Sequence, residues 1–574
     1  MNRAQRIYVY VVLAATAVIA AIGASTLLGA LADQAWPGRT LQGRPTSGIA
    51  LGLSMLIVSV PVWLFHWRVA SRKVAADPAE SARGLRQAYL AFVKVVSVVF
   101  IGTSTGGIVR DVSGGHANAL SGDTLARLVV WGAVWAFHWR TARRTWQPGH
   151  EGRSFHRWYL YAVAAGSLAV GVVGLAMLLG GLLSAVYDAA RSEEVLHTGE
   201  VWTRGMQESL GAALAGFILW GWHWRRGAAG DRDSTLRDFY AAAATTLSAA
   251  TVVVSVIFIL QTFVRIGLGS LNGAAADRIG DLAGWAGFAV AAGLAWLYHA
   301  PLLLWPKRAL EPSLARPVSG WAYRYAALAI GLAAMSTGAV IAISLLGGLL
   351  IPAGDVLHES AGGVREGVAA AIASAVVGLA IWLPMWVGAL RARSLLAGVQ
   401  DAGPAASEQV SDREQVERLY LFGVAGAGLL AAVGASATLL FIVINDLLNG
   451  DVGARTLDSG RWAAGVVMTG GAVAYLHFRA IRGGLREAVA EAMPAKRKRI
   501  VLIAPAGSGP AKNALQAAAS QTIDWRVDLS GPPLDAWQPT PQDIALTADR
   551  IKSAPGRTVQ VIAGPAGAIV VSYD

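Results

Sequence analysis

One short pattern recurs at the ends of apolar stretches and constrains the fold more than any other feature of this sequence. A Trp is followed three residues later by His-Trp-Arg at three places, and weaker versions of the same pattern occur at three more. The complete copies are Trp63-Leu-Phe-His66-Trp67-Arg68, Trp135-Ala-Phe-His138-Trp139-Arg140 and Trp220-Gly-Trp-His223-Trp224-Arg225, and the weaker copies contain His299, Met385 and His477. Six copies indicate six repeats of one structural unit.

Composition places these units in a membrane. The chain has 574 residues, of which 55% are hydrophobic and only 15% are charged, and its mean hydropathy is +0.48. These values predict a multi-pass membrane protein and exclude an ordinary soluble one. The sequence contains no cysteine, which excludes disulfides and thiolate-bound metals or clusters. The net charge of +12 is explained by Lys and Arg in the loops on one side of a membrane, so we expect no nucleic-acid partner.

Each unit is predicted to be a helical hairpin. A first apolar run begins beside an Arg and a Tyr, and a second run ends on the signature pattern; each run has about the 20 residues needed to cross the hydrocarbon core. The first helices are expected to start near residues 8, 89, 159, 240, 325 and 420, and the second helices to end near residues 67, 139, 224, 304, 390 and 478. The prediction is therefore twelve membrane-spanning helices.

A longer period groups the hairpins in pairs. The third and fifth hairpins share Val-Leu-His, ending at His197 and His358, and the fourth and sixth share Leu-Asn-Gly, beginning at Leu271 and Leu448. The repeating module is thus expected to contain four helices. Three tandem modules are predicted, at residues 1–150, 151–312 and 313–490.

This pattern resembles an uncharacterised bacterial membrane family, a domain of unknown function whose module is four transmembrane helices with an aromatic-His-Trp-Arg ending. The resemblance covers all three modules, residues 1–490. It implies an all-α polytopic protein of a bacterial plasma membrane. The family carries no established activity to transfer.

The distribution of basic residues predicts the orientation. The loops within hairpins carry ten Lys and Arg, whereas the linkers between hairpins carry twenty-two. Basic loops stay in the cytoplasm. We therefore expect the signature ends of the helices and both chain termini to lie on the cytoplasmic side of the inner membrane.

The composition changes after Arg479, and residues 495–574 are predicted to form a small cytoplasmic α/β domain. A basic link, Lys496-Arg497-Lys498-Arg499, leads into it. Alternating and apolar runs predict strands at 500–504, 522–529, 558–563 and 568–573, and helices at 511–520 and 543–553. A Gly-Ser-Gly loop between the first strand and helix has the context of a phosphate loop, but its spacing fits neither a Walker loop nor a dinucleotide fingerprint.

The signature residues are interpreted as anchors at the membrane boundary, because Trp, Tyr and Arg gather where hydrocarbon meets water. Haem or metal ligation and pH sensing by the His residues are the alternatives. One His per hairpin at one depth spreads the ring nitrogens apart, so we expect no cofactor, no metal and no catalytic group, with imidazoles touching head groups or backbone. The anchor set is Trp63, His66, Trp67, Arg68, Trp135, His138, Trp139, Arg140, Trp220, His223, Trp224, Arg225, His299 and His477.

Two functions stay open at this point. A non-enzymatic membrane scaffold or sensor, with a tail that binds a cytoplasmic protein, is favoured because the middle of the predicted spans lacks Asp and Glu. Lys94, near the start of its span, is expected to snorkel to the surface. The alternative, a transporter or channel for an uncharged or lipid-like solute, is favoured by the internal repetition. Membrane lipids are partners in both cases.

Overall fold

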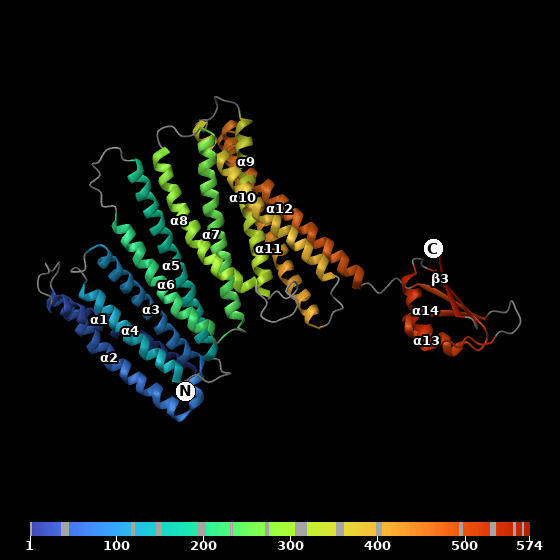
Figure 1. Ribbon diagram of the computed structural model, residues 1–574, viewed down its shortest axis with the longest axis horizontal. Helices are drawn as coiled ribbons and strands as arrows, with labels where there is room; N and C mark the ends of the chain where they lie inside the picture. The colour runs from blue at the N-terminus through green and yellow to red at the C-terminus, as the bar shows by residue number, and fades with distance from the viewer. Residues whose placement is uncertain are drawn as a thin grey trace. The chain divides into compact units, whose positions relative to one another are not determined.

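A computed structural model shows two compact units, Met1–Leu476 and His477–Asp574 (Figure 1). The units are described separately. The structure describes residues 3–573 apart from 36–44, 116–120, 145–151, 192–201, 230, 232–233, 270–274, 305–317, 352–360, 398–403, 493–497, 528–534, 555–557 and 565–566.

Long helices build the first unit. In chain order they are α1 (Arg3–Ala35), α2 (Pro45–Ala76), α3 (Gly84–Ser113), α4 (Gly122–Arg144), α5 (Gly152–Arg191), α6 (Arg204–Ala229), α7 (Thr235–Gly267), α8 (Ala275–Leu304), α9 (Val318–Leu349), α10 (Ala361–Ala397), α11 (Pro404–Asn449) and α12 (Ala454–Ala492), of which the last continues into the second unit. A short 3-10 helix, η1 (Pro78–Ala82), precedes α3. The predicted helical hairpins are therefore present.

Ten of these helices are long and apolar enough to cross a membrane. The chain is accordingly a multi-pass membrane protein by the length and composition of its described helices. The other two, α4 and α6, have charged residues at both ends, among them Asp123 and Arg144 in α4 and Arg204 and Arg226 in α6. A count of twelve spans stays a prediction.

The hairpins pack in a regular order. Each of α1, α3, α5 and α7 contacts the second helix of its own hairpin and also the second helix of the next hairpin, as α5 does with α6 and α8. The first helices also contact one another in sequence, from α1 through α3, α5, α7 and α9 to α11. Figure 1 shows the resulting row of helices, coloured from blue to orange.

Glycines allow the helices to approach closely. A Cβ atom added at Gly216 of α6 would meet the backbone of Gly171 in α5, and one added at Gly174 would meet the backbone of Ala213. Gly428 of α11 and Gly470 of α12 face each other in the same way. Small residues at these crossings bring backbones into contact, which is how helices associate where the hydrophobic effect offers no drive.

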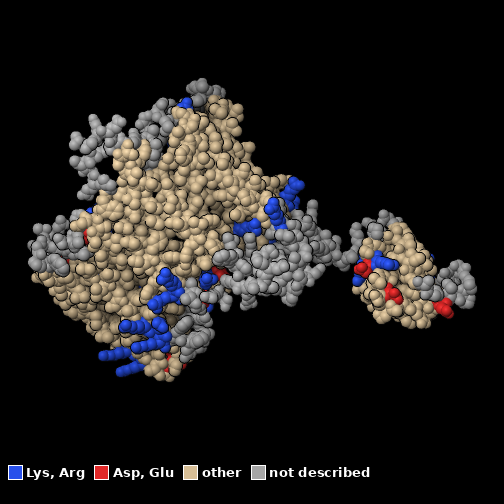
Figure 2. Space-filling view, in the orientation of Figure 1, with Lys and Arg blue, Asp and Glu red and all other residues tan. Residues whose placement is uncertain are grey.

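Charge is concentrated at one end of the first unit. We call this the signature end: it is formed by the starts of the odd-numbered helices and the ends of the even-numbered ones. On the face shown in Figure 2, Lys and Arg gather near this end and the remaining helical surface is largely free of charge. The asymmetry agrees with the basic linkers seen in the sequence.

The second unit contains a four-stranded sheet of β1 (Arg499–Ala504), β2 (Ile523–Val527), β3 (Thr558–Gly564) and β4 (Gly567–Tyr573), in the order β2-β1-β3-β4. β1 is parallel to β2 and β3, and β4 is antiparallel to β3. Helices α13 (Gly509–Ala519) and α14 (Pro541–Ser553) pack on one face through Leu515 and Ile551. The predicted α/β domain is present, and its element boundaries are close to those read from the sequence.

Local bonds fix the ends of α14. The Thr540 hydroxyl accepts from the Asp543 N–H at 3.2 Å, and the Asp543 carboxylate accepts from the Thr540 N–H at 3.0 Å, which is a capping box. The hydroxyl and N–H of Thr540 hold the pKa of Asp543 below its usual value. At the other end, the Lys498 ammonium donates to the carbonyls of Ile551, Lys552 and Ala554. Neither of the two described helices of this unit covers the opposite face of the sheet, and Ile569 is 67% exposed there.

Candidate functional site

The signature residues form a repeated hydrogen-bond chain that joins neighbouring hairpins. In the clearest copy, Trp135 Nε1 of α4 donates to the hydroxyl of Tyr159 in α5 at 2.7 Å. The same hydroxyl lies 2.8 Å from Nε2 of His223 in α6. The chain ends within α6, where His223 Nδ1 lies 2.7 Å from the carbonyl of Leu219. One tyrosine thus ties together three helices from two hairpins.

The next hairpin repeats this arrangement. Trp220 Nε1 donates to the Tyr240 hydroxyl at 2.8 Å, and that hydroxyl lies 3.2 Å from His299 Nε2. His299 Nδ1 lies 2.8 Å from the carbonyl of Ala295. The copies extend in both directions along the row. The Tyr89 hydroxyl is 2.8 Å from His138 Nε2, and Trp296 Nε1 donates to the Tyr323 hydroxyl at 2.8 Å.

The direction of every proton in this chain can be assigned from chemistry. A carbonyl only accepts, so the imidazole Nδ1 must carry the proton that it donates to the preceding helical turn. In the neutral ring Nε2 is then an acceptor, and the tyrosine O–H donates to it. The tyrosine oxygen in turn accepts from the indole N–H. The chain therefore runs from Trp through Tyr to His and ends on a backbone carbonyl.

This assignment limits what the imidazoles can do. Both nitrogens of His138, His223 and His299 are engaged, one as donor and one as acceptor. A proton arriving at Nε2 has no onward acceptor, because the Nδ1 proton is committed to a carbonyl. A metal ion would have to displace the tyrosine to reach a lone pair. The geometry is suited to fixing helices in place.

Burial separates the members of the predicted anchor set. The side chains of His66, His138, His223 and His299 are between 0% and 6% exposed, and Trp139 and Trp224 are also buried. Trp63, Trp67, Trp135, Trp220 and His477 are half-buried, whereas Arg68, Arg140 and Arg225 are exposed. The imidazoles were expected to touch head groups or backbone, and the four buried ones contact a backbone carbonyl of their own helix. Whether the set lies at a membrane boundary stays a prediction.

The first and fifth hairpins depart from the pattern. His66 bonds through Nδ1 to the carbonyl of Val62 at 2.8 Å, but its neighbour Tyr8 is an exposed ring with its centroid 5.5 Å away. In the fifth hairpin Met385 takes the place of the His. A thioether is a weak acceptor, so Tyr323 loses the strong partner that Tyr159 and Tyr240 have. Among the described contacts, the copies centred on Tyr159 and Tyr240 are complete.

A second set of contacts at the signature end was not predicted. The Arg6 Nε donates to both carboxylate oxygens of Glu80, at 2.9 and 3.1 Å, and Glu80 is only 2% exposed. In the second module Arg157 pairs with Asp231, whose other oxygen accepts from the Tyr161 hydroxyl at 3.2 Å. Both ion pairs join residues 74 positions apart. That shared separation was the sequence signal that could have revealed them.

Arginine side chains also lie near tryptophan rings at the signature end. Arg86 lies 5.7 Å from the ring centroid of Trp67, and Arg237 lies at the same distance from Trp224. The third module differs. Trp321 stands four residues before Tyr325, where the first two modules have Arg6 and Arg157 before Tyr10 and Tyr161. There Arg413 lies 6.0 Å from the Trp321 ring and pairs with Glu417 at 2.7 Å.

Lys94 does not reach the surface, contrary to the expectation that it snorkels. Its side chain is 1% exposed, and its Nζ lies 4.0 Å from the ring centroid of Tyr159 and 5.5 Å from that of Trp139. A buried ammonium over two aromatic faces is a cation–π contact. The ring of Tyr159 is therefore held by Lys94 while its hydroxyl is held by Trp135 and His223.

The row of apolar helices and this interhelical bonding define the class of the protein as a polytopic helical membrane protein built from tandem repeats. The chain belongs to the family described as Domain of unknown function (DUF5671), which matches it three times, at residues 6–123, 157–294 and 322–472. This confirms the resemblance to an uncharacterised family with internal repeats. Each match lies inside one predicted module. No curated protein and no solved structure matches the chain.

We predict that the Tyr159–His223 bond contributes measurably to stability. In a double-mutant cycle of Tyr159→Phe and His223→Phe, thermal unfolding in detergent should give a coupling free energy between about 0.6 kcal/mol, the average for interhelical hydrogen bonds in membranes, and about 1.7 kcal/mol, the largest value. Tyr8→Phe is the matched control, because Tyr8 follows Arg6 as Tyr159 follows Arg157 but its ring is exposed. Additive effects in the cycle, or an equal loss from Tyr8→Phe, would contradict the assignment.

Proposed function

We propose that the protein is a non-enzymatic scaffold of a bacterial inner membrane, which holds its C-terminal domain in the cytoplasm for a partner protein. One observation carries the proposal. Successive hairpins are joined at the same end by Trp–Tyr hydrogen bonds, in Trp135–Tyr159, Trp220–Tyr240 and Trp296–Tyr323. These bonds connect the second, third, fourth and fifth hairpins into one continuous row.

The use of polar groups supports this role. A carrier moves one block of helices against another, which would separate bonded partners at one of these joints. Breaking such a bond takes the indole donor away from a buried tyrosine hydroxyl, and an unsatisfied buried polar group costs about 1–3 kcal/mol. Three such joints in series favour one fixed arrangement. Imidazoles are the groups at this end best suited to acid–base chemistry, and those of His138, His223 and His299 are already engaged at both nitrogens, which supports a role without catalysis.

The C-terminal sheet supports the proposed contact with a protein partner. Its helices cover one face, whereas the other face presents Ile562, Ile569, Val571 and Tyr573, all substantially exposed. Exposed apolar side chains that lie side by side on a sheet mark an interaction surface. We infer that this face receives the partner.

The partner surface predicts where crosslinks form in living cells. A photoreactive residue in place of Ile569 should give a discrete protein adduct, because its side chain points away from the helices. The same residue at Asp549, on exposed α14, is the control and should give none. Adducts from both positions, or from neither, would count against this surface.

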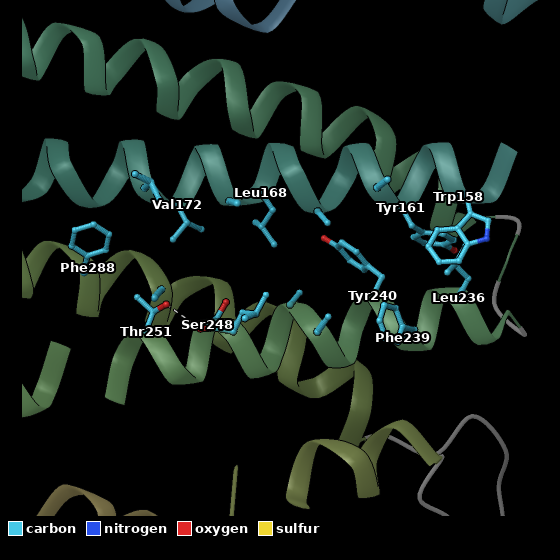
Figure 3. A pocket seen from close by; sticks show the side chains of 18 residues that line it. Trp158, Tyr161, Leu168, Val172, Leu236, Phe239, Tyr240, Ser248, Thr251 and Phe288 are labelled. Atoms are coloured by element: carbon cyan, nitrogen blue, oxygen red, sulfur yellow. Dashed lines mark hydrogen bonds between the residues drawn. The ribbon is translucent and has the colours of Figure 1, made fainter. Parts of the chain in front are cut away.

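A second function, a carrier for a lipid-like solute, is favoured by one specific feature. An apolar groove of about 290 Å³ lies between α5, α7 and α8. Figure 3 shows its length, from Trp158 and Leu236 at one end to Thr251 and Phe288 at the other. Its lining includes no charged residue, which suits an apolar solute.

Spin labels separate these two functions. The chain has no cysteine, so label pairs can be placed at will on exposed positions: Val112 with Leu268 at the far ends of α3 and α7, and Leu85 with Phe239 at the signature end. A scaffold predicts one narrow distance distribution for each pair, measured by double electron–electron resonance in bilayers. Two populations that change in opposite senses at the two ends would indicate a carrier.

Loss of one joint should loosen the scaffold. Trp220→Phe removes the donor to Tyr240 and is expected to broaden the signature-end distribution. Trp222→Phe is the control on the same helix, because the Trp222 ring is exposed. Equal effects of the two changes would show that the joint does not fix the helices.

A further inference from the structure

A second groove lies where the first and second modules meet. It is formed by α3, α5 and α6 and has a volume of about 570 Å³. On α3 the lining residues recur at one face for four turns, from Val95 to Arg110. Those 15 residue steps, at 1.5 Å each, make the groove about 22 Å long. The groove is therefore longer than one leaflet of the hydrocarbon core, which is about 15 Å thick, half of a core of about 30 Å.

The walls of this groove are smooth and apolar. Glycines on all three helices, including Gly102, Gly166 and Gly216, line the groove and have no side chain to fill it. Val99 and Val170 are exposed at its edges. A Cβ atom added at Gly166 would meet nothing within 4 Å. Because α3 and α5 are long and apolar enough to span a membrane, the open side of the groove faces lipid chains.

Charge is present only at one end of the groove. Arg110 and Glu208 line that end. The Glu208 side chain is 52% exposed and the Arg110 side chain 33% exposed, and each pairs with a neighbour: Arg110 with Asp111 at 2.7 Å, and Glu208 with Arg204 at 3.1 Å. An exposed ion pair contributes about 0–1 kcal/mol, so Glu208 can exchange Arg204 for another cation at little cost, and the exposed part of the Arg110 guanidinium can bind a second anion beside Asp111. The site has two cations, Arg110 and Arg204, and two anions, Asp111 and Glu208, so its net charge is zero. It is therefore complementary to a head group that carries one positive and one negative charge.

A tryptophan lies at the same end. Trp202 Nε1 donates to the carbonyl of Ser113, the last residue of α3, at 2.8 Å. Trp is enriched where the hydrocarbon core meets the head groups. The position of Trp202 therefore marks the charged end as the head-group level. The groove between α5, α7 and α8 has no such charged end, which distinguishes the two.

We propose that the groove between α3, α5 and α6 holds one acyl chain of a zwitterionic glycerophospholipid, with the phosphate recognised by Arg110 and the ammonium by Glu208. The lipid fills the joint between two repeats along the row. The inference does not depend on the scaffold function, since the distance measurements and the lipid measurements can fail separately.

Crosslinking to the unaltered protein tests the location. The full chain in bilayers is exposed to phosphatidylethanolamine with a diazirine on one acyl chain, and adducts are mapped by mass spectrometry. Adducts should concentrate on the facing stretches of α3, α5 and α6. Adducts spread evenly over all lipid-exposed helices would overturn the proposal. No variant is needed for this arm, so it is unaffected by folding failures.

Filling the groove tests its occupancy. Gly166→Phe should reduce these adducts, and the lipid retained in native mass spectrometry, by about tenfold, equivalent to 1.4 kcal/mol. Gly434→Phe is the matched control, because Gly434 is also an exposed helical glycine with nothing within 4 Å of an added Cβ. Equal retention in the two variants would overturn the proposal.

Head-group recognition is tested by competition. Unlabelled phosphatidylethanolamine should displace the probe at least tenfold better than phosphatidylglycerol or diacylglycerol with the same chains. The double change Arg110→Gln and Glu208→Gln should abolish that preference while the acyl chain still labels the groove. Equal competition by all three lipids in the unaltered protein would refute the roles of Arg110 and Glu208.

Discussion

The tyrosine hydroxyl at each joint is the interaction on which the helical row depends. At Tyr159 and Tyr240 it accepts from an indole of one hairpin and donates to an imidazole of its own hairpin, so these two tyrosines use both of their hydrogen-bonding capacities. In a protein interior without water, an unpaired hydroxyl is costly and a fully paired one specifies a unique arrangement. Glycines at the crossings then let the helices come close enough for these bonds to form.

The imidazole completes this arrangement because its two nitrogens differ. Nδ1 bonds to the carbonyl one turn earlier, which fixes the ring plane and leaves Nε2 directed at the neighbouring helix. The spacing from Trp135 to His138 places the two rings on adjacent faces of one helix, so the indole reaches the next hairpin while the imidazole stays within its own. The copies of the sequence pattern that contain Trp135 and Trp220 thus each place one indole and one imidazole where they can bond to tyrosines of two successive hairpins.

Much of the fold could be predicted because apolar runs and periodicity determine where helices and strands begin and end. The hairpins, the repeat and every strand of the C-terminal sheet were read in this way. The contacts of the candidate site were harder to predict from the sequence. A pattern gives the position of His223 along its helix but not the face that meets Tyr159, because that contact depends on how two helices cross. For this reason the sequence analysis predicted imidazoles that touch head groups or backbone and did not predict their bonds to tyrosine.

The sequence analysis did not predict the buried charged groups, because their burial also depends on how distant helices pack. Lys94 lies near the start of an apolar run, where a long side chain usually reaches water. The structure instead places Tyr159 and Trp139 from two other helices around it. The pairing of Arg6 with Glu80 also joins distant parts of the chain. Only the equal separation of Arg157 and Asp231 hinted at it, and that hint needed the two modules to be aligned.

The central claim is that the bonded histidines are neutral rings with the proton on Nδ1. Nitrogen-15 solid-state NMR of the histidine-labelled protein in bilayers tests it most directly, with His138, His223 and His299 assigned by their single replacements with Gln. The account predicts a protonated Nδ1 and an unprotonated, hydrogen-bonded Nε2 at neutral pH in all three. A proton on Nε2, or a doubly protonated ring, would contradict it.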